Sequence, residues 1–173
     1  MGCKTRNTPM MHAISLKPRR PFACTLLILL QLLLGAGALF GGGSLIIDPS
    51  GTLIQLPASL LEHTPLDSFL VPGIILFTVL GILPLMIAFG LVTKKKWQAA
   101  DRLKLFRDRH WSWNLSLYTG FVLIGWITIQ MYLVHGVALL HVTYIFWGML
   151  VQAVTLLPEV QKVYRADNGL PIS

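Results

Sequence analysis

Charged residues are missing from most of this chain. Four apolar segments of 19, 24, 19 and 20 residues contain no Asp, Glu, Lys or Arg: Phe22–Phe40, Phe69–Val92, Ser116–Val134 and Ala138–Leu157. About 20 apolar residues in a helix cross the roughly 30 Å of hydrocarbon in a bilayer. A helix also satisfies its own backbone hydrogen bonds there. The sequence therefore predicts an all-α membrane protein, a bundle of four transmembrane helices.

Positive charge is also absent from two of the connections, residues 41–68 and 135–136. All 14 Lys and Arg residues precede residue 22, lie between residues 93 and 110, or follow residue 158. Cytoplasmic loops carry the excess of Lys and Arg, so both termini are predicted to be cytoplasmic (N-in/C-in). The predicted organisation is a basic tail (1–21), a transmembrane domain (22–158) and a second cytoplasmic tail (159–173).

The lack of intramembrane acids and of paired cysteines excludes several classes of membrane protein. Proton-coupled exporters need a buried acid that binds and releases protons. Quinone-linked thiol oxidoreductases with four helices need a CxxC pair, and the only cysteines are Cys3 and Cys24. Intramembrane aspartyl peptidases need two acids that share a water, whereas Asp48 and Asp67 lie in unlike surroundings.

The net charge of +7 is explained by the side of the membrane on which the basic residues lie. They flank the spans and form no groove with aromatic platforms, so we expect no nucleic-acid partner. Each basic residue near an anionic leaflet contributes about 1 kcal/mol. Loop 93–110 is therefore expected to bind anionic lipid headgroups, with Trp97, Trp111 and Trp113 in the inner aromatic belt. A protein partner and a homo-oligomer are both left open.

The outer connection between the first two spans contains sequence motifs that favour defined turns and caps. Asp48-Pro49-Ser50-Gly51 matches a type I turn, and Thr64-Pro65-Leu66-Asp67 matches a cap for the second span, with Thr64 as N-cap. Gly41-Gly42-Gly43 is expected to end the first helix, and the Gly37 and Gly41 spacing equally suits a close helix contact. Pro84 is expected to kink the second span. We therefore predict a structured outer loop that covers the helix ends.

Acids and histidines also collect on the outer side: Asp48, Glu62, His63, Asp67, His135 and His141. Carboxylates and imidazoles bind divalent metals, which makes Asp48, Glu62, His63 and His141 the candidates for a metal site. No HxxxH or HExxH spacing supports such a site, and the turn and the cap account for Asp48 and Asp67. We expect no catalytic residue, no metal site and no cofactor. The intramembrane Gln31, Gln130 and Gln152 are expected to hydrogen-bond to neighbouring helices.

The first apolar segment has features of a secretory signal. Arg19-Arg20 precede Leu26–Leu34, and Ala36-Gly37-Ala38 resembles a cleavage site. The apolar run continues through Phe40 and three more spans follow, so we expect an uncleaved helix, with cleavage after Ala38 as the alternative. Met1, Met10 and Met11 are alternative translation starts.

Several short motifs resemble those of small four-span bacterial membrane proteins: Gly42-Gly43-Ser44, Asp48-Pro49-Ser50-Gly51, Thr64-Pro65-Leu66, Phe69-Leu70-Val71-Pro72-Gly73 and Gly125-Trp126-Ile127 with Gln130. The resemblance covers residues 22–160 and implies a bacterial cytoplasmic membrane, but no activity.

Three functions are compatible with this pattern. The first is a non-enzymatic structural or accessory subunit of a membrane complex. The second is a transporter or channel component, for which Pro84 and the intramembrane Gln residues are the support. The third is a membrane-embedded enzyme that uses the outer acids and histidines.

Overall fold

The computed structural model describes residues 20–62, 64–102, 105–106 and 108–165 of the 173-residue chain. The described part is mostly helical and contains no β-strand. Four helical stretches are long and apolar enough to cross a membrane: Phe22–Ile47, Leu70–Thr93, Trp111–Val134 and Leu139–Leu156. The predicted helical class, with four candidate spans, is therefore confirmed.

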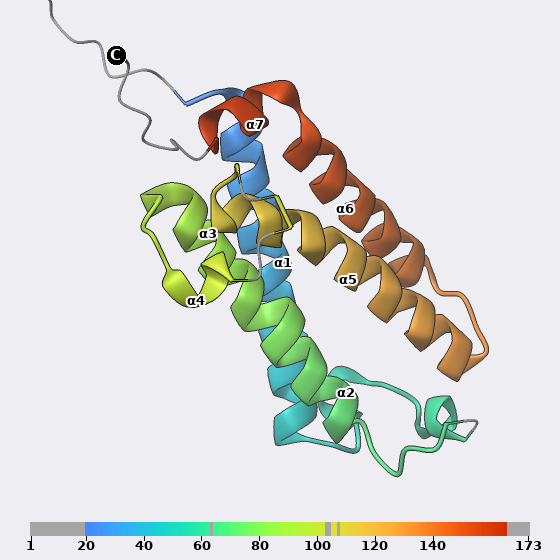
Figure 1. The fold of residues 1–173 in the computed structure, drawn as a ribbon. Helices are drawn as coiled ribbons and strands as arrows, with labels where there is room; N and C mark the ends of the chain where they lie inside the picture. Colours follow the sequence, from blue (N-terminus) through green and yellow to red (C-terminus); the bar gives the residue numbers. More distant parts are fainter. Residues whose placement is uncertain (1–19, 63, 103–104, 107, 166–173) are drawn as a thin grey trace, which may run out of the picture.

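Two antiparallel helical hairpins make up the bundle (Figure 1). The first pairs α1 (Phe22–Ile47) with a continuous stretch of α2 (Leu70–Ile75), the π-helical segment η3 (Leu76–Ile82) and α3 (Leu83–Thr93). The second pairs α5 (Trp111–Val134) with α6 (Leu139–Leu156). Short helices occupy the connections: η1 (Thr52–Ile54), η2 (Ala58–Leu61), α4 (Gln98–Asp101) and, after α6, α7 (Pro158–Val163).

Glycines bring the helix backbones of the first hairpin close together. A Cβ atom on Gly42 would lie 2.6 Å from the backbone nitrogen of Phe77 and 2.8 Å from the carbonyl oxygen of Gly73. A Cβ atom on Gly35 would lie 3.0 Å from the carbonyl oxygen of Gly81. Small residues permit this close approach. The van der Waals packing that results stabilises the helix pair, because no hydrophobic force acts between helices in lipid.

Glycines also bring the helix backbones of the second hairpin close together. A Cβ atom on Gly120 would lie 2.8 Å from the carbonyl oxygen of Gly148, and one on Gly148 would lie 3.0 Å from that of Gly120. Each of these glycines is buried. The two hairpins are therefore separate units, each closed by direct contact between backbones.

The first helix is longer than predicted. Gly41–Gly43 do not end it, because α1 continues through them to Ile47. The packing of Gly42 against α2 and η3 offsets the low helix propensity of glycine, about 1 kcal/mol per residue relative to alanine. Gly37 and Gly41 do not form the closest contact, since their Cβ atoms would lie 3.7 Å from Tyr144 and 3.5 Å from Leu76.

The second span changes helix type beside Pro84. Residues 76–82 are π-helical, and Pro84 follows near the start of α3. Proline has no N–H to donate to the carbonyl of Leu80, and π-helical turns mark interruptions of the regular ladder. The sequence predicts a kink at Pro84, and the structure shows this change of hydrogen bonding directly before it.

All described Lys and Arg residues lie at one end of the bundle, the basic end: Arg20, Lys94, Lys95, Lys96, Arg102, Arg109, Lys162 and Arg165. Arg20 donates to the carbonyl oxygen of Val92 at 2.6 Å, and Lys94 to that of Val163 at 3.0 Å. Cations near the final carbonyls of a helix are favourable because the helix dipole is negative there. The opposite end, with residues 48–69 and 135–138, is the loop end.

Large aromatic side chains join the two hairpins at the basic end. The indole of Trp111 packs on Gly90 of α3 and donates to the carbonyl oxygen of Lys95 at 2.8 Å. The indole of Trp113 donates to the carbonyl oxygen of Thr155 at 2.8 Å and so joins α5 to α6 within the second hairpin. Trp111 and Trp113 are 4% and 2% exposed, so they pack inside the bundle, whereas Trp97 is 39% exposed.

The segment after α6 belongs to this packing as far as the structure describes it. α7 begins at Pro158, and Tyr164 is buried, its hydroxyl donating to the carbonyl oxygen of Leu91 at 2.8 Å. Burial raises the pKa of Tyr164 to about 12. α5 also begins earlier than predicted, at Trp111, because His110 accepts a hydrogen bond from the backbone nitrogen of Ser112 and caps it.

Replacing Gly42 with alanine should destabilise the first hairpin by about 1–3 kcal/mol, the usual cost of overpacking, because backbone atoms surround the new methyl group. The matched change Gly43→Ala places its Cβ atom 3.7 Å from the Phe77 ring, so it should leave stability unchanged or raise it. Thermal unfolding in detergent measures both variants. Equal melting temperatures would contradict the assigned glycine contact.

Candidate functional site

The two hairpins separate toward the loop end and leave a half-open cavity between them. α3 packs against α5 near the basic end, whereas α5 and α6 diverge from α1 and α2 toward the loop end (Figure 1). The cavity has a volume of about 520 Å³. Volumes of roughly 300–1,000 Å³ with mostly apolar walls are typical of small-molecule sites.

The walls of this first cavity come from both hairpins and from the outer loop. α1 supplies Leu34, Ala38 and Leu45, and the loop supplies Ile54, Leu56 and Leu60. Phe69, Leu76 and Leu80 close a second side, and Leu123 and Ile127 of α5 a third. These side chains are mainly aliphatic, so the cavity matches a hydrocarbon better than a polar solute.

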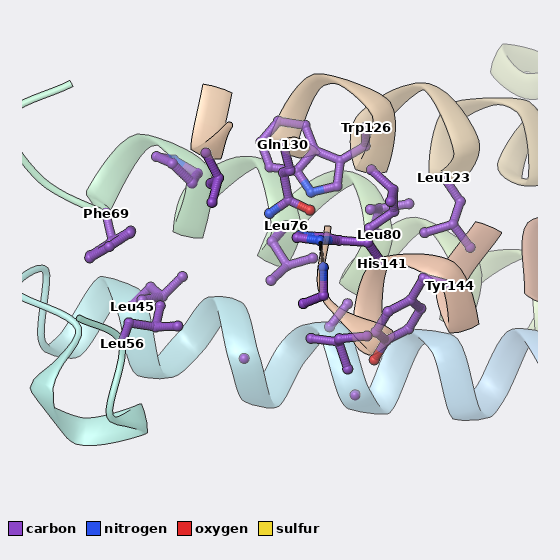
Figure 2. Close-up of a pocket in the computed structure, with 18 of the residues that line it drawn as sticks. Leu45, Leu56, Phe69, Leu76, Leu80, Leu123, Trp126, Gln130, His141 and Tyr144 are labelled. Atoms are coloured by element: carbon purple, nitrogen blue, oxygen red, sulfur yellow. Dashed lines mark hydrogen bonds between the residues drawn. The ribbon is translucent and has the colours of Figure 1, made fainter. Parts of the chain in front are cut away.

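Four residues bring polar groups to these apolar walls: Trp126 and Gln130 of α5 and His141 and Tyr144 of α6 (Figure 2). The indole nitrogen of Trp126 is buried and has no hydrogen-bond partner within the described part of the chain. His141 accepts a hydrogen bond at Nδ1 from the backbone nitrogen of Ala138 at 3.1 Å. In the uncharged imidazole the proton is then on Nε2, which makes that nitrogen a donor.

A second cavity of about 370 Å³ adjoins the first. It lies between the outer loop, α2 and α5, with walls that include Leu61, Leu66, Val71, Ile75 and Leu133. Six residues line both cavities: Leu60, Phe69, Pro72, Trp126, Gln130 and Val134. The polar groups of Trp126 and Gln130 therefore belong to the wall that the two cavities share.

The outer loop covers the cavities and is held by Asp48. The Asp48 carboxylate accepts hydrogen bonds from the Ser50 hydroxyl at 2.5 Å, the Thr52 hydroxyl at 2.6 Å and the backbone nitrogen of Leu53 at 2.8 Å. These donors, that of Ser50 first, hold the pKa of the Asp48 carboxyl well below its usual range. The predicted turn is present, since the Gly51 nitrogen donates to the Asp48 carbonyl at 3.0 Å.

The predicted cap of the second span is wrong. The Thr64 hydroxyl accepts from the backbone nitrogen of Leu66 at 3.3 Å and donates to the carbonyl of Leu61 at 3.0 Å. α2 begins only at Leu70, with Phe69 at the N-cap position. Thr64 therefore stabilises a turn within the loop, and the loop continues further before the helix begins.

The metal candidates have separate environments. Asp48 is occupied by the loop donors, Glu62 is exposed, and His141 bonds to Ala138 at the start of α6. His63 lies outside the described residues. Within the described residues, no three His, Cys, Asp or Glu side chains gather closely enough to hold a metal ion.

Gln31 does not form the predicted interhelical hydrogen bond with any residue that the structure describes. Its side chain is fully buried, and neither its amide oxygen nor its amide nitrogen has a partner among the residues that the structure describes. Leaving a buried polar group unpaired costs about 1–3 kcal/mol. Gln31 lies between Leu30 of the core cluster near the basic end and Leu34 of the cluster toward the loop end, and Trp147 packs against both clusters.

The sequence contains a signal for the cavity residues. Trp126 and Gln130 are four residues apart and His141 and Tyr144 three, spacings that place each pair on one helix face. What the spacing cannot show is that these two faces lie opposite each other across a gap.

No family model, no curated protein and no solved structure matches this chain. The site therefore has to be interpreted from its own geometry.

Asp48 should stabilise the folded protein through its carboxylate, so Asp48→Asn should lower the melting temperature at neutral pH. A lowered pKa in the folded state means that the stabilisation is present above the ordinary pKa of about 3.9. It is lost as the pH falls through the lower pKa of the folded state. Thermal melts should thus show the wild-type advantage constant from pH 8 to 5 and shrinking below pH 4.

Asp67→Asn is the matched control, since Asp67 is an exposed acid of the same loop. It should change the melting temperature little at any pH. If both substitutions had equal effects, the carboxylate bonds of Asp48 would not be what holds the loop.

Proposed function

We propose that this chain is a multi-pass integral membrane protein of a bacterial cytoplasmic membrane, with both termini in the cytoplasm. Four helices of sufficient length and hydropathy support the membrane location. The basic end supports the orientation, because Lys and Arg are retained on the cytoplasmic side. The resemblance to small four-span bacterial proteins supports the cytoplasmic membrane.

An uncleaved first helix is part of this proposal. α1 runs without a break through Ala38 to Ile47, and Leu27, Leu30 and Leu34 are buried core residues. Cleavage after Ala38 would remove these three side chains and the Gly35 contact with Gly81. The bundle would then lose the packing partner of its second span.

We propose further that the protein is a non-enzymatic accessory subunit that acts by binding. The observation that carries this proposal is the apolar cavity between the two hairpins toward the loop end. Such a cavity suits the binding of a hydrophobic group from the membrane or from a partner. The exposed Lys96 and Arg102 at the basic end suit anionic headgroups of the inner leaflet.

A transporter or channel component is the second candidate. The π-helical segment before Pro84 and the unpartnered Gln31 favour it, because interrupted helices and intramembrane polar groups recur along transport pathways. In this function the two hairpins would move against each other about the basic end.

The orientation predicts which positions an impermeant thiol reagent reaches on intact cells. In a background without Cys3 and Cys24, single cysteines at the exposed Ser50 and Ser59 should react from outside. A cysteine at the exposed Gln98 should react only after lysis. Labelling of Gln98→Cys on intact cells would overturn the proposed topology.

An accessory subunit should co-purify with its complex. Affinity purification of the full chain in a mild detergent, followed by mass spectrometry, should recover a stoichiometric protein partner that resists washing. A protein recovered only as a homo-oligomer would favour the transporter alternative. An unrelated four-span protein expressed at the same level is the control for non-specific association.

A further inference from the structure

Trp126, Gln130 and His141 each bring a hydrogen-bond donor to the cavities, where Gln130 and Tyr144 also offer acceptors. The indole N–H of Trp126 donates only, and the Nε2 atom of His141 is a donor when its Nδ1 atom accepts from Ala138. Gln130 adds an amide N–H to the shared wall. A buried donor without a partner is costly, so a ligand that supplies an acceptor oxygen would relieve Trp126.

The acceptor should be uncharged. None of the described residues that line either cavity is a Lys, Arg, Asp or Glu. Burial of an anion in apolar surroundings without a cation is far more costly than burial of a neutral carbonyl. Ester or ketone carbonyls therefore suit this donor set, whereas phosphate and carboxylate do not.

Two of the three donors lie near the depth at which lipid chains meet their headgroups, and the third, Trp126, lies deeper, eight residues or about 12 Å before the end of α5 at Val134. Gln130 is four residues before the end of α5 at Val134, and His141 is two residues after the start of α6 at Leu139. At 1.5 Å per residue, both are within about 6 Å of the helix ends. Their donors face the level at which hydrocarbon gives way to the interface.

Two adjoining apolar spaces distinguish between the possible carbonyl ligands. The cavities of about 520 and 370 Å³ meet at the wall that carries Trp126 and Gln130. A molecule with two hydrocarbon chains joined at carbonyl groups would fill both spaces and place its acceptors at that wall. An isoprenoid quinone, with one chain, would leave the second space unfilled.

We propose that the two cavities bind one diacyl glycerolipid, with one acyl chain in each and an ester carbonyl that accepts a hydrogen bond from Trp126. The outer loop, held by Asp48, covers the chains at the loop end. This deepens the proposed binding function by naming its ligand. It does not depend on which side of the membrane the loop end faces.

Lipid-depleted full-length protein in dodecyl maltoside is the material for the test. It is titrated with dioleoylphosphatidylcholine, with oleoyl-lysophosphatidylcholine and with menaquinone, while native mass spectrometry counts the bound molecules. The diacyl lipid should bind at one molecule per chain and raise the melting temperature. The lysolipid, with the same headgroup and one chain, should bind at least tenfold more weakly, and menaquinone should not saturate.

Three variants locate the site. Trp126→Phe removes the indole N–H together with part of the ring, and the loss of one net hydrogen bond should by itself weaken diacyl-lipid binding about three- to tenfold. Gly37→Leu projects into the first cavity from a position whose Cβ atom has its nearest neighbour at 3.7 Å, so it should abolish binding. Gly125→Leu, where a Cβ atom would have no neighbour within 4 Å, is the matched control and should bind as wild type.

Equal affinity for the lysolipid, or saturable binding of menaquinone at higher affinity, would overturn the two-chain assignment. Unchanged lipid binding by Trp126→Phe would overturn the role of the indole, whether or not Gly37→Leu folds. Absence of saturable binding by the diacyl lipid would overturn the site as a whole. None of these results bears on the topology, which the cysteine labelling tests separately.

Discussion

Direct contact between helix backbones at glycine is the interaction on which this structure depends. Lipid is as apolar as the helix surfaces, so burial of leucine against leucine supplies little net attraction within a membrane. Gly42 against Gly73 and Gly120 against Gly148 instead bring peptide groups to the closest approach that two helices permit. Each pair closes one of the two hairpins.

The two hairpins pack more closely at the basic end than at the loop end, and this difference leaves the cavity. Trp111, Trp113 and Tyr164 join helices at the basic end by packing and by hydrogen bonds to backbone carbonyls. Toward the loop end the cavity remains between the hairpins, with Leu76, Trp126 and Tyr144 and the outer loop among its walls.

Two unpaired polar side chains, those of Trp126 and Gln31, each favour a different one of the two proposed functions. Trp126 lines the cavity, and its buried indole N–H has no partner in the described part of the chain, so it suits a ligand that brings an acceptor oxygen. Gln31 is fully buried in the packed core, where a change in the arrangement of the hairpins would be needed to reach it. Trp126 therefore suits a binding protein with a fixed structure, whereas Gln31 suits a transporter whose hairpins move.

The sequence by itself determined the number and helical character of the candidate spans, because the lack of charge and the need to satisfy the backbone in lipid are local properties. The Asp48 turn was equally readable, since its donors follow within five residues. Only the tertiary structure decided that α1 continues through Gly41–Gly43, that Trp111 and Trp113 are buried, and that Thr64 does not cap α2. The first two depend on contacts with distant segments, whereas Thr64 is held within its own loop by Leu61 and Leu66. The cavity belongs to the same class, because a space between two hairpins is a property of how they pack.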